Sequence, residues 1–244
     1  MSSFHPAYRE LLTESPCLHG EDGQNQWSLA QEVMDWLTEN VRPGDRTLET
    51  GCGYSTLIFA MAGAQHTVIS PIPEEHDHIR RWGLAHGVDF SKVTFIAAKS
   101  EDVLPNFGPE PLDLVLIDGW HAMPAPFIDW FFTCTKLAVG GRVMVDDTQI
   151  LPCRILREFL EQETGRWSLE RRFKRTDVFR KLKEQMFEGD WRDQPWGARP
   201  ILTLADYFRL IVRPTLVRGL RRLPGIVPAM KKLRSLIQNR NKSN

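Results

Sequence analysis

The chain has 244 residues, of which 42% are apolar and 25% charged, with 31 basic and 31 acidic side chains. This composition is typical of a soluble globular protein and excludes a disordered or collagen-like chain. The length suffices for a hydrophobic core without disulfide bonds. The four cysteines show no C-x-x-C spacing and no interleaved histidines, so we expect free thiols in a reducing compartment. Residues 1–10 lack the basic and apolar regions of a signal peptide, which predicts a cytoplasmic protein.

The neutral net charge hides two oppositely charged regions. Residues 1–179 hold 16 basic and 26 acidic side chains, a balance of −10, whereas residues 180–244 hold 15 basic and five acidic ones, a balance of +10. This shift predicts two regions with different partners. Residues 50–73 carry no Asp, Glu, Lys or Arg and are long enough to span a bilayer, but their glycines, prolines and polar side chains predict that they do not.

Short apolar runs alternate with segments of helical periodicity between residues 26 and 163. In chain order the pattern predicts a helix at 26–40, a strand at 46–49, a helix at 55–62, a strand at 66–69, a helix at 74–86, strands at 93–97 and 112–117, a helix at 125–137, a strand at 142–145 and a helix at 151–163. This alternation predicts an α/β fold with a doubly wound, mostly parallel sheet covered on both faces. On the helix at 74–86, we expect His76, His78 and His86 to face solvent.

The C-terminal part of the chain departs from this alternation. In residues 201–237 apolar side chains recur at helical spacing between prolines, and no acidic residue follows Asp206. Two or three short amphipathic helices with basic faces are therefore expected. The predicted organisation is an N-terminal extension at 1–25, an α/β domain at 26–182 and a basic helical extension at 183–244.

The loop after the first predicted strand is the expected ligand-binding element, because doubly wound sheets bind ligands at the carboxyl ends of their strands. Gly51 and Gly53 allow close approach of a ligand, and Glu49 places a carboxylate at the strand end. A dinucleotide site needs a third glycine where Thr56 stands and an acidic residue where Ser70 stands. A nicotinamide cofactor is thus disfavoured, and a purely structural glycine turn remains the alternative.

Three carboxylates follow two other apolar strands. Asp118 comes directly after the strand at 112–117, and Asp146 and Asp147 follow the strand at 142–145. Adjacent parallel strands bring all three to one rim, where like charges repel unless a cation or protons intervene. Oxygen ligands suit magnesium, manganese or calcium, so the sequence predicts a divalent metal site. The alternative is that Asp146 and Asp147 cap the next helix or order its loop.

In order and spacing, the segments 48–56, 117–119 and 140–148 resemble those of class I S-adenosylmethionine-dependent methyltransferases, closest to their small O-methyltransferase-like branch. The resemblance covers about residues 27–181. It implies a Rossmann-like sheet of seven strands and S-adenosylmethionine as the cofactor. The cofactor-binding residues that it implies are Glu49, Thr50, Gly51, Gly53, Ser55, Ser70, Ser100 and Glu101.

The same resemblance implies methyl transfer to a hydroxyl oxygen of a small metabolite or sugar, assisted by a divalent metal such as magnesium, with no nucleic-acid partner. Metal-dependent relatives carry acidic or amide ligands at the positions of Asp118, Asp146 and Asp147. Catechol-type relatives place a lysine base where this chain has His121, three residues after Asp118. A histidine with an ordinary pKa near 6.5 is able to deprotonate a hydroxyl group at neutral pH, so His121 and Asp118 are the predicted catalytic residues.

One departure from these relatives concerns the ribose. They usually carry an acidic residue at the end of the second strand to hold the ribose hydroxyls, where this chain has Ser70. Either Ser70 replaces it with a weaker hydrogen bond, or Glu74 or Glu75 reaches back. The missing residue also keeps open an alternative from another class, a non-catalytic binding module with the same fold.

The basic extension generates the first testable prediction. Amphipathic helices with basic faces bind anionic membrane surfaces, where each basic residue near the headgroups contributes about 1 kcal/mol. Alternatively the extension docks on the acidic domain or on a second subunit of a homo-oligomer, which the opposite charges favour. Co-sedimentation with anionic and neutral vesicles at low and high salt separates these cases. Binding to anionic vesicles alone, lost on truncation after Asp206, supports the membrane partner, and no binding at low salt contradicts it.

Overall fold

The computed structural model describes residues 4–20, 23, 28–108, 111–184, 189–190, 193–196 and 212. The chain divides into two compact units, Met1–Gly197 and Ala198–Asn244. The predicted basic helices lie outside the described residues except for Val212. Their existence and the predicted domain boundaries at residues 25 and 182 therefore stay predictions.

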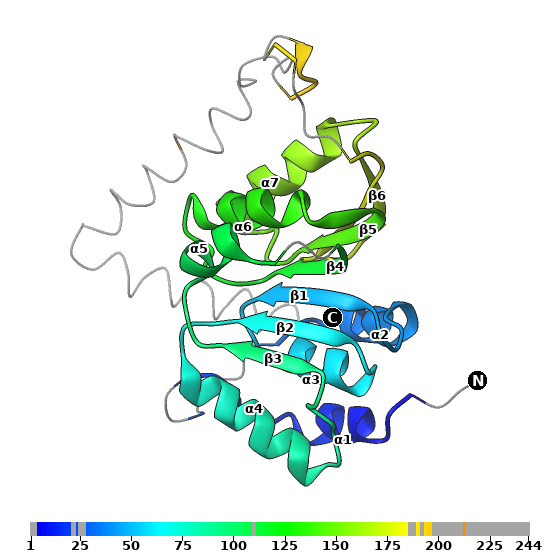
Figure 1. Ribbon diagram of the computed structural model, residues 1–244, viewed down its shortest axis with the longest axis vertical. Helices are drawn as coiled ribbons and strands as arrows, with labels where there is room; N and C mark the ends of the chain where they lie inside the picture. The colour runs from blue at the N-terminus through cyan, green and yellow to red at the C-terminus, as the bar shows by residue number, and fades with distance from the viewer. Residues whose placement is uncertain are drawn as a thin grey trace, which may run out of the picture. The chain divides into compact units, whose positions relative to one another are not determined.

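The first unit is built around a seven-stranded sheet with the strand order β3-β2-β1-β4-β5-β7-β6 (Figure 1). The strands are β1 (Arg46–Thr50), β2 (Gln65–Ile69), β3 (Val93–Ile96), β4 (Leu112–Ile117), β5 (Leu137–Val145), β6 (Trp167–Arg172) and β7 (Asp177–Lys181). Strands β1 to β5 pair in parallel, whereas β7 runs antiparallel to both of its neighbours. The predicted doubly wound, mostly parallel sheet of seven strands is confirmed.

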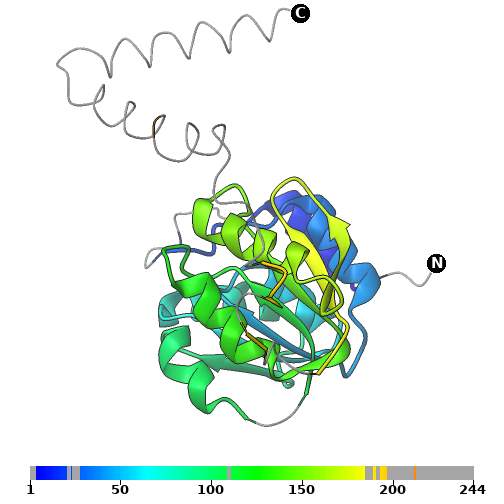
Figure 2. The same ribbon diagram turned by 90° about the horizontal axis from the view of Figure 1, so that it is seen from above.

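Helices cover both faces of this sheet (Figure 2). One face packs against α1 (Ala7–Glu14), α2 (Gln31–Asn40), α3 (Tyr54–Met61) and α4 (Pro73–Ala85), and the other against α5 (Ser100–Val103), the short helix η1 (Leu104–Asn106), α6 (Ala125–Cys134) and α7 (Leu151–Gln162). Within β4, Leu114 and Leu116 belong to the first core cluster, and Val115 and Ile117 to the second. Because successive side chains enter opposite cores, the strand is a continuous apolar run.

Strand β5 begins earlier than the sequence pattern predicts. Helix α6 ends at Cys134, and Leu137, expected in that helix, already pairs with Leu112 of β4. The Leu112 N–H donates to the Lys136 carbonyl at 2.8 Å, and the pairing of β4 with β5 then shifts register before Arg142. This extension depends on a neighbouring strand that is distant in sequence, so local periodicity does not show it.

The expectation that His76 faces solvent is wrong. Its side chain is buried and its ring packs against Phe95, with ring centroids 5.2 Å apart. His78 and His86 are half-buried. The N-terminal segment at residues 18–20 covers this end of α4, because the Gly20 N–H donates to Glu75 and the Leu18 carbonyl lies 3.4 Å from His78 Nδ1. Helix α4 therefore buries a wider face than its apolar residues predict.

Among the described residues, no helix has both the length and the apolar composition needed to cross a membrane. Residues 50–73, which the sequence predicts not to span a bilayer, contain α3 and β2 and the loops beside them. The four cysteines form no disulfide.

The packing of α3 on the sheet gives a prediction about stability. Phe59 of α3 is completely buried and stacks on His66 of β2, with ring centroids 4.4 Å apart. We expect Phe59→Ala to lower the free energy of unfolding by about 3–5 kcal/mol, because it leaves a cavity in the core. Phe131→Ala is the matched control, since Phe131 is 50% exposed, and we expect a loss of about 1 kcal/mol or less. Urea unfolding measures both changes, and equal losses would contradict this account of the core.

Candidate active site

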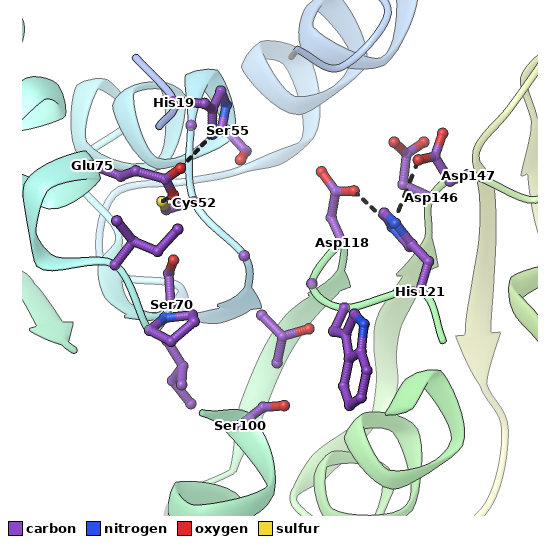
Figure 3. Close-up of a pocket in the computed structure, with 18 of the residues that line it drawn as sticks. His19, Cys52, Ser55, Ser70, Glu75, Ser100, Asp118, His121, Asp146 and Asp147 are labelled. Carbon is purple, nitrogen blue, oxygen red and sulfur yellow. Dashed lines mark hydrogen bonds and ion pairs between the residues drawn. The ribbon is translucent and has the colours of Figure 1, made fainter. Parts of the chain in front are cut away.

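A cavity of about 870 Å³ opens where the carboxyl ends of β1 and β4 meet (Figure 3). Strands β2 and β3 lie on one side of this pair and β5 on the other, so the order of the sheet reverses here. Such a switch point is where open α/β sheets bind their ligands. The cavity has the size of pockets that hold cofactors and small molecules.

The glycine loop after β1 passes very close to the end of β4. Gly51 has a φ of +91°, and a Cβ atom placed on it would lie 2.3 Å from the carbonyl oxygen of Asp118. The Gly51 N–H donates to the Ile69 carbonyl of β2 at 2.9 Å, and the Asp118 N–H donates to the Thr50 carbonyl at 3.0 Å. The backbone between β1 and α3 is thus held from both neighbouring strands, which makes a rigid floor for the cavity.

Glu49 lies beneath this loop and is not among the residues that line the cavity. Its buried carboxylate accepts hydrogen bonds from the hydroxyl groups of Ser55, at 2.5 Å, and Thr56, and lies 3.1 Å from Nε2 of His66. Ser55 and Thr56 stand in the first turn of α3, so Glu49 holds the start of this helix against the sheet. Its predicted contact with the cofactor stays a prediction.

All the other predicted cofactor residues line the cavity, namely Thr50, Gly51, Gly53, Ser55, Ser70, Ser100 and Glu101. Ser100 and Glu101 begin α5, and Ser70 follows β2. The four predicted metal and catalytic residues line it as well, namely Asp118, His121, Asp146 and Asp147. The structure therefore gathers eleven of the twelve predicted site residues in one cavity.

The acidic side chains of the rim surround His121. Its Nε2 atom lies 3.6 Å from Oδ1 of Asp118 and 3.6 Å from Oδ2 of Asp147. Asp147 has a φ of +50°, a left-handed conformation that aspartate tolerates better than most residues. Asp146 is set apart from this group, because its Oδ1 accepts a hydrogen bond from the Thr176 hydroxyl and its side chain is nearly inaccessible.

The environment raises the pKa values of these groups. Burial raises the pKa of Asp118 to about 7, and the nearby carboxylates of Asp146 and Asp147 add to the effect against the opposing influence of His121. Burial likewise raises the pKa of Asp146. The adjacent Asp118 carboxylate raises the pKa of His121, which makes the imidazole a stronger base than a free histidine.

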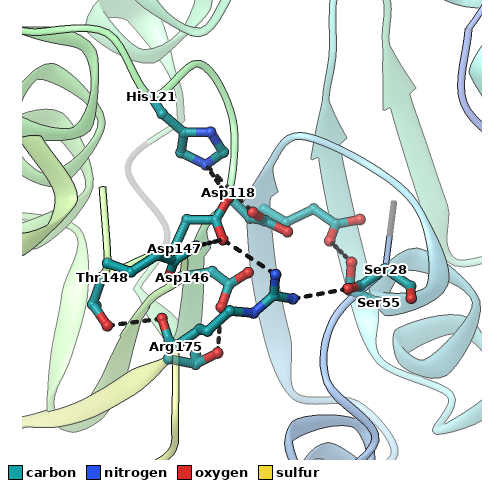
Figure 4. A network of polar contacts seen from close by, with 11 residues as sticks. Ser28, Ser55, Asp118, His121, Asp146, Asp147, Thr148 and Arg175 are labelled. Atoms are coloured by element: carbon teal, nitrogen blue, oxygen red, sulfur yellow. Dashed lines mark hydrogen bonds and ion pairs between the residues drawn. The ribbon is translucent and has the colours of Figure 1, made fainter. Parts of the chain in front are cut away.

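Arg175 closes this end of the cavity and no sequence pattern indicates it (Figure 4). It stands in the turn between β6 and β7, and its backbone carbonyl accepts hydrogen bonds from the N–H and hydroxyl groups of Thr148. Its guanidinium lies 3.8 Å from Oδ1 of Asp147 and donates to the Ser28 carbonyl at 3.3 Å. The antiparallel hairpin thus adds a positive charge beside the carboxylates.

The opposite end of the cavity is lined by residues of the N-terminal segment and α4. His19 and Glu75 are buried there, and Cys52 of the glycine loop lies beside them (Figure 3). The sequence indicates Glu75 only as one of three candidates, and His19 carries no local signal because the N-terminal segment is distant from the loop in sequence. Trp120, 66% exposed, is a further lining residue that the sequence analysis did not single out.

The fold and sequence of this domain are similar to those of known methyltransferases. Residues 48–148 match a family model described as a methyltransferase domain. No curated protein has a sequence that matches this chain. The matched residues include the glycine loop and the rim carboxylates, so this part of the chain is similar to a methyltransferase domain, in agreement with the resemblance seen in the sequence.

Solved structures share this fold at low sequence identity. The O-methyltransferase TomG from Streptomyces achromogenes, in complex with S-adenosylmethionine, is 18% identical with a TM-score of 0.56 over 71% of this chain and 90% of TomG. Cofactor-bound Rv0187 from MTB is also 18% identical, with a TM-score of 0.57 over 74% of this chain and 91% of its own. A putative rRNA-methylase from Clostridium thermocellum is 14% identical, with a TM-score of 0.53 over 65% of this chain and all of its own. These likenesses concern the fold.

The glycine loop gives a prediction about cofactor binding. We expect Gly51→Ala to weaken binding of S-adenosylhomocysteine by at least about tenfold, because the new methyl group collides with the backbone at Asp118 and displaces the loop. Gly44→Ala is the matched control, since Gly44 has a φ of +89° and no atom within 4 Å of its Cβ position. Both variants carry the same conformational strain, so calorimetric titration isolates the effect of the collision. Unchanged affinity in Gly51→Ala would contradict the placement of the cofactor at this loop.

Proposed function

We propose that this methyltransferase transfers the methyl group of S-adenosylmethionine to a hydroxyl oxygen of a small metabolite or sugar, with assistance from a divalent cation. The observation that carries the proposal is the position of His121 between Asp118 and Asp147 at the rim of the cavity. This arrangement brings an imidazole and two carboxylates into the cavity that the glycine loop lines. The presence of an O-methyltransferase among the structures that share the fold supports the choice of acceptor atom.

His121 is suited to accept the proton of the acceptor hydroxyl. Within the described part of the chain, its Nε2 atom is buried and has no hydrogen-bond partner. In the absence of a cation, the two flanking carboxylates, each 3.6 Å away, stabilise the imidazolium that forms when the proton arrives. Methyl transfer itself is a displacement at the sulfonium, for which the protein mainly has to align donor and acceptor.

The acidic rim also fits a divalent cation. One ligand atom each from Asp118, His121 and Asp147 lies within 4.8 Å of the others, and carboxylate oxygens are the ligands that magnesium and manganese prefer. We assign the cation first to Asp118 and Asp147, and Asp146 contributes through the oxygen that Thr176 does not occupy. When bound there, a cation would supply a Lewis acid that acidifies and orients the acceptor hydroxyl. His121 then remains available as the base.

The proposal predicts that activity depends on a divalent cation. Treatment with a chelator should abolish turnover of hydroxylated acceptors, and magnesium should restore it, because the cation orients the nucleophile. Asp147→Asn should reduce turnover by at least about tenfold, since it removes an anionic ligand. Asp113→Asn is the matched control, because Asp113 is exposed and is not among the residues that line the cavity. Full turnover after exhaustive chelation would contradict the requirement for a divalent cation. Catalysis would then depend on His121 and Asp118 without a metal.

A further inference from the structure

The end of β2 provides no carboxylate to accept hydrogen bonds from the ribose hydroxyl groups of the cofactor. Ser70 and Pro71 follow β2 and line the cavity, and neither carries a carboxylate. The ribose of S-adenosylmethionine has two adjacent hydroxyl groups, and a hydroxyl donor that is buried without an acceptor destabilises the complex. A single serine hydroxyl serves only one of them well. Another acceptor must therefore come from a different element.

Two adjacent glutamates of α4 are placed very differently. Both stand in the first turn of the helix, but Glu74 is exposed, whereas Glu75 is only 5% exposed and lines the cavity. In Figure 3 the carboxylate of Glu75 lies beside Cys52, with Ser70 on the same side of the cavity. Of these two glutamates, Glu75 and not Glu74 therefore reaches the cavity.

Two separate parts of the chain, the N-terminal segment at residues 19–20 and the glycine loop, hold the Glu75 carboxylate. The Gly20 N–H donates to its Oε1 at 2.8 Å, and the Cys52 thiol donates to its Oε2 at 3.3 Å. His19 Nδ1 lies 3.6 Å from Oε1. A carboxylate has about four lone-pair positions, and within the described residues these contacts occupy three of them, one with a weak thiol donor. Acceptor capacity therefore remains for a ligand in the cavity.

These contacts also keep Glu75 ionised. Burial by itself raises its pKa, but the nearby His19 imidazole and the hydrogen bonds from Gly20 and Cys52 more than offset this effect, so the pKa lies below its usual value. An ionised carboxylate makes stronger hydrogen bonds to hydroxyl groups than a neutral acceptor does. Its place in the first turn of α4 stabilises the negative charge further.

We propose that Glu75 is the ribose-binding residue of this methyltransferase, with its carboxylate accepting hydrogen bonds from the 2′ and 3′ hydroxyls and with His19 and Cys52 positioning it. The acid that relatives carry at the strand end is supplied here by the following helix. This inference rests on the cofactor of the proposed function and is independent of the acceptor and of the cation.

The test compares two ligands on three proteins by calorimetric titration. The ligands are S-adenosylhomocysteine and its 2′-deoxy analogue, and the proteins are the wild type, Glu75→Gln and the matched control Glu74→Gln. The wild type and Glu74→Gln should prefer S-adenosylhomocysteine by about tenfold or more, as expected for a hydrogen bond to a charged group. Glu75→Gln should bind S-adenosylhomocysteine about 10- to 100-fold more weakly and discriminate between the ligands by less than about threefold.

If Glu75 had a purely structural role, Glu75→Gln would weaken the binding of both ligands equally. A Glu75→Gln protein that still discriminates between the ligands as the wild type does therefore overturns the proposal. Equal affinity of the wild type for the two ligands overturns the proposal as well, and this measurement does not require a folded Glu75→Gln variant. Thermal unfolding of both variants shows whether they fold. The titrations contain no methyl acceptor, so they do not depend on the proposed reaction. A failure of the enzyme to methylate hydroxyl groups would contradict that reaction and would not affect the assignment of Glu75.

Discussion

The close passage of the backbone at Gly51 past the end of β4 is the constraint on which the site depends. The Gly51 N–H bonds to β2, the Thr50 carbonyl accepts from Asp118, and the space between the two chains leaves no room for a side chain. Parallel pairing of β1 with both neighbours therefore sets where the loop turns and where Asp118 stands. The cavity, its floor and its acidic rim all follow from this contact, since each is built on the carboxyl ends of the same strands.

Negative charge is concentrated at two ends of the cavity, and each end is held differently. At one end Glu75 is fixed by the N-terminal segment and the glycine loop. At the other, Asp118 and Asp147 flank His121, and Arg175 adds a positive charge. Buried carboxylates are stable only when they are paired or hydrogen-bonded, and each of these has such contacts. The glycine loop that lines the cavity between the two ends carries no charged side chain.

Much of the fold could be predicted from local patterns, and the errors have physical causes. The apolar run of β4 was recognisable because both faces of this central parallel strand are buried. The early start of β5 at Leu137 was not, because backbone pairing with Leu112 extends the strand beyond its apolar run. The burial of His76 was missed because its ring packs against Phe95 of β3, a contact between two elements that the periodicity of α4 does not show.

The sequence by itself determined the glycine loop, the strand-end carboxylates Asp118, Asp146 and Asp147, and the nearby His121. Their positions follow from where apolar strands end, which is a local property of the chain. Only the tertiary structure decided that Glu75 rather than Glu74 enters the cavity, that Glu49 supports the loop from beneath, and that Arg175 and His19 complete the walls. Each of these depends on contacts between segments far apart in sequence, because the direction in which a side chain at the end of a strand or helix points is set by the elements packed around it.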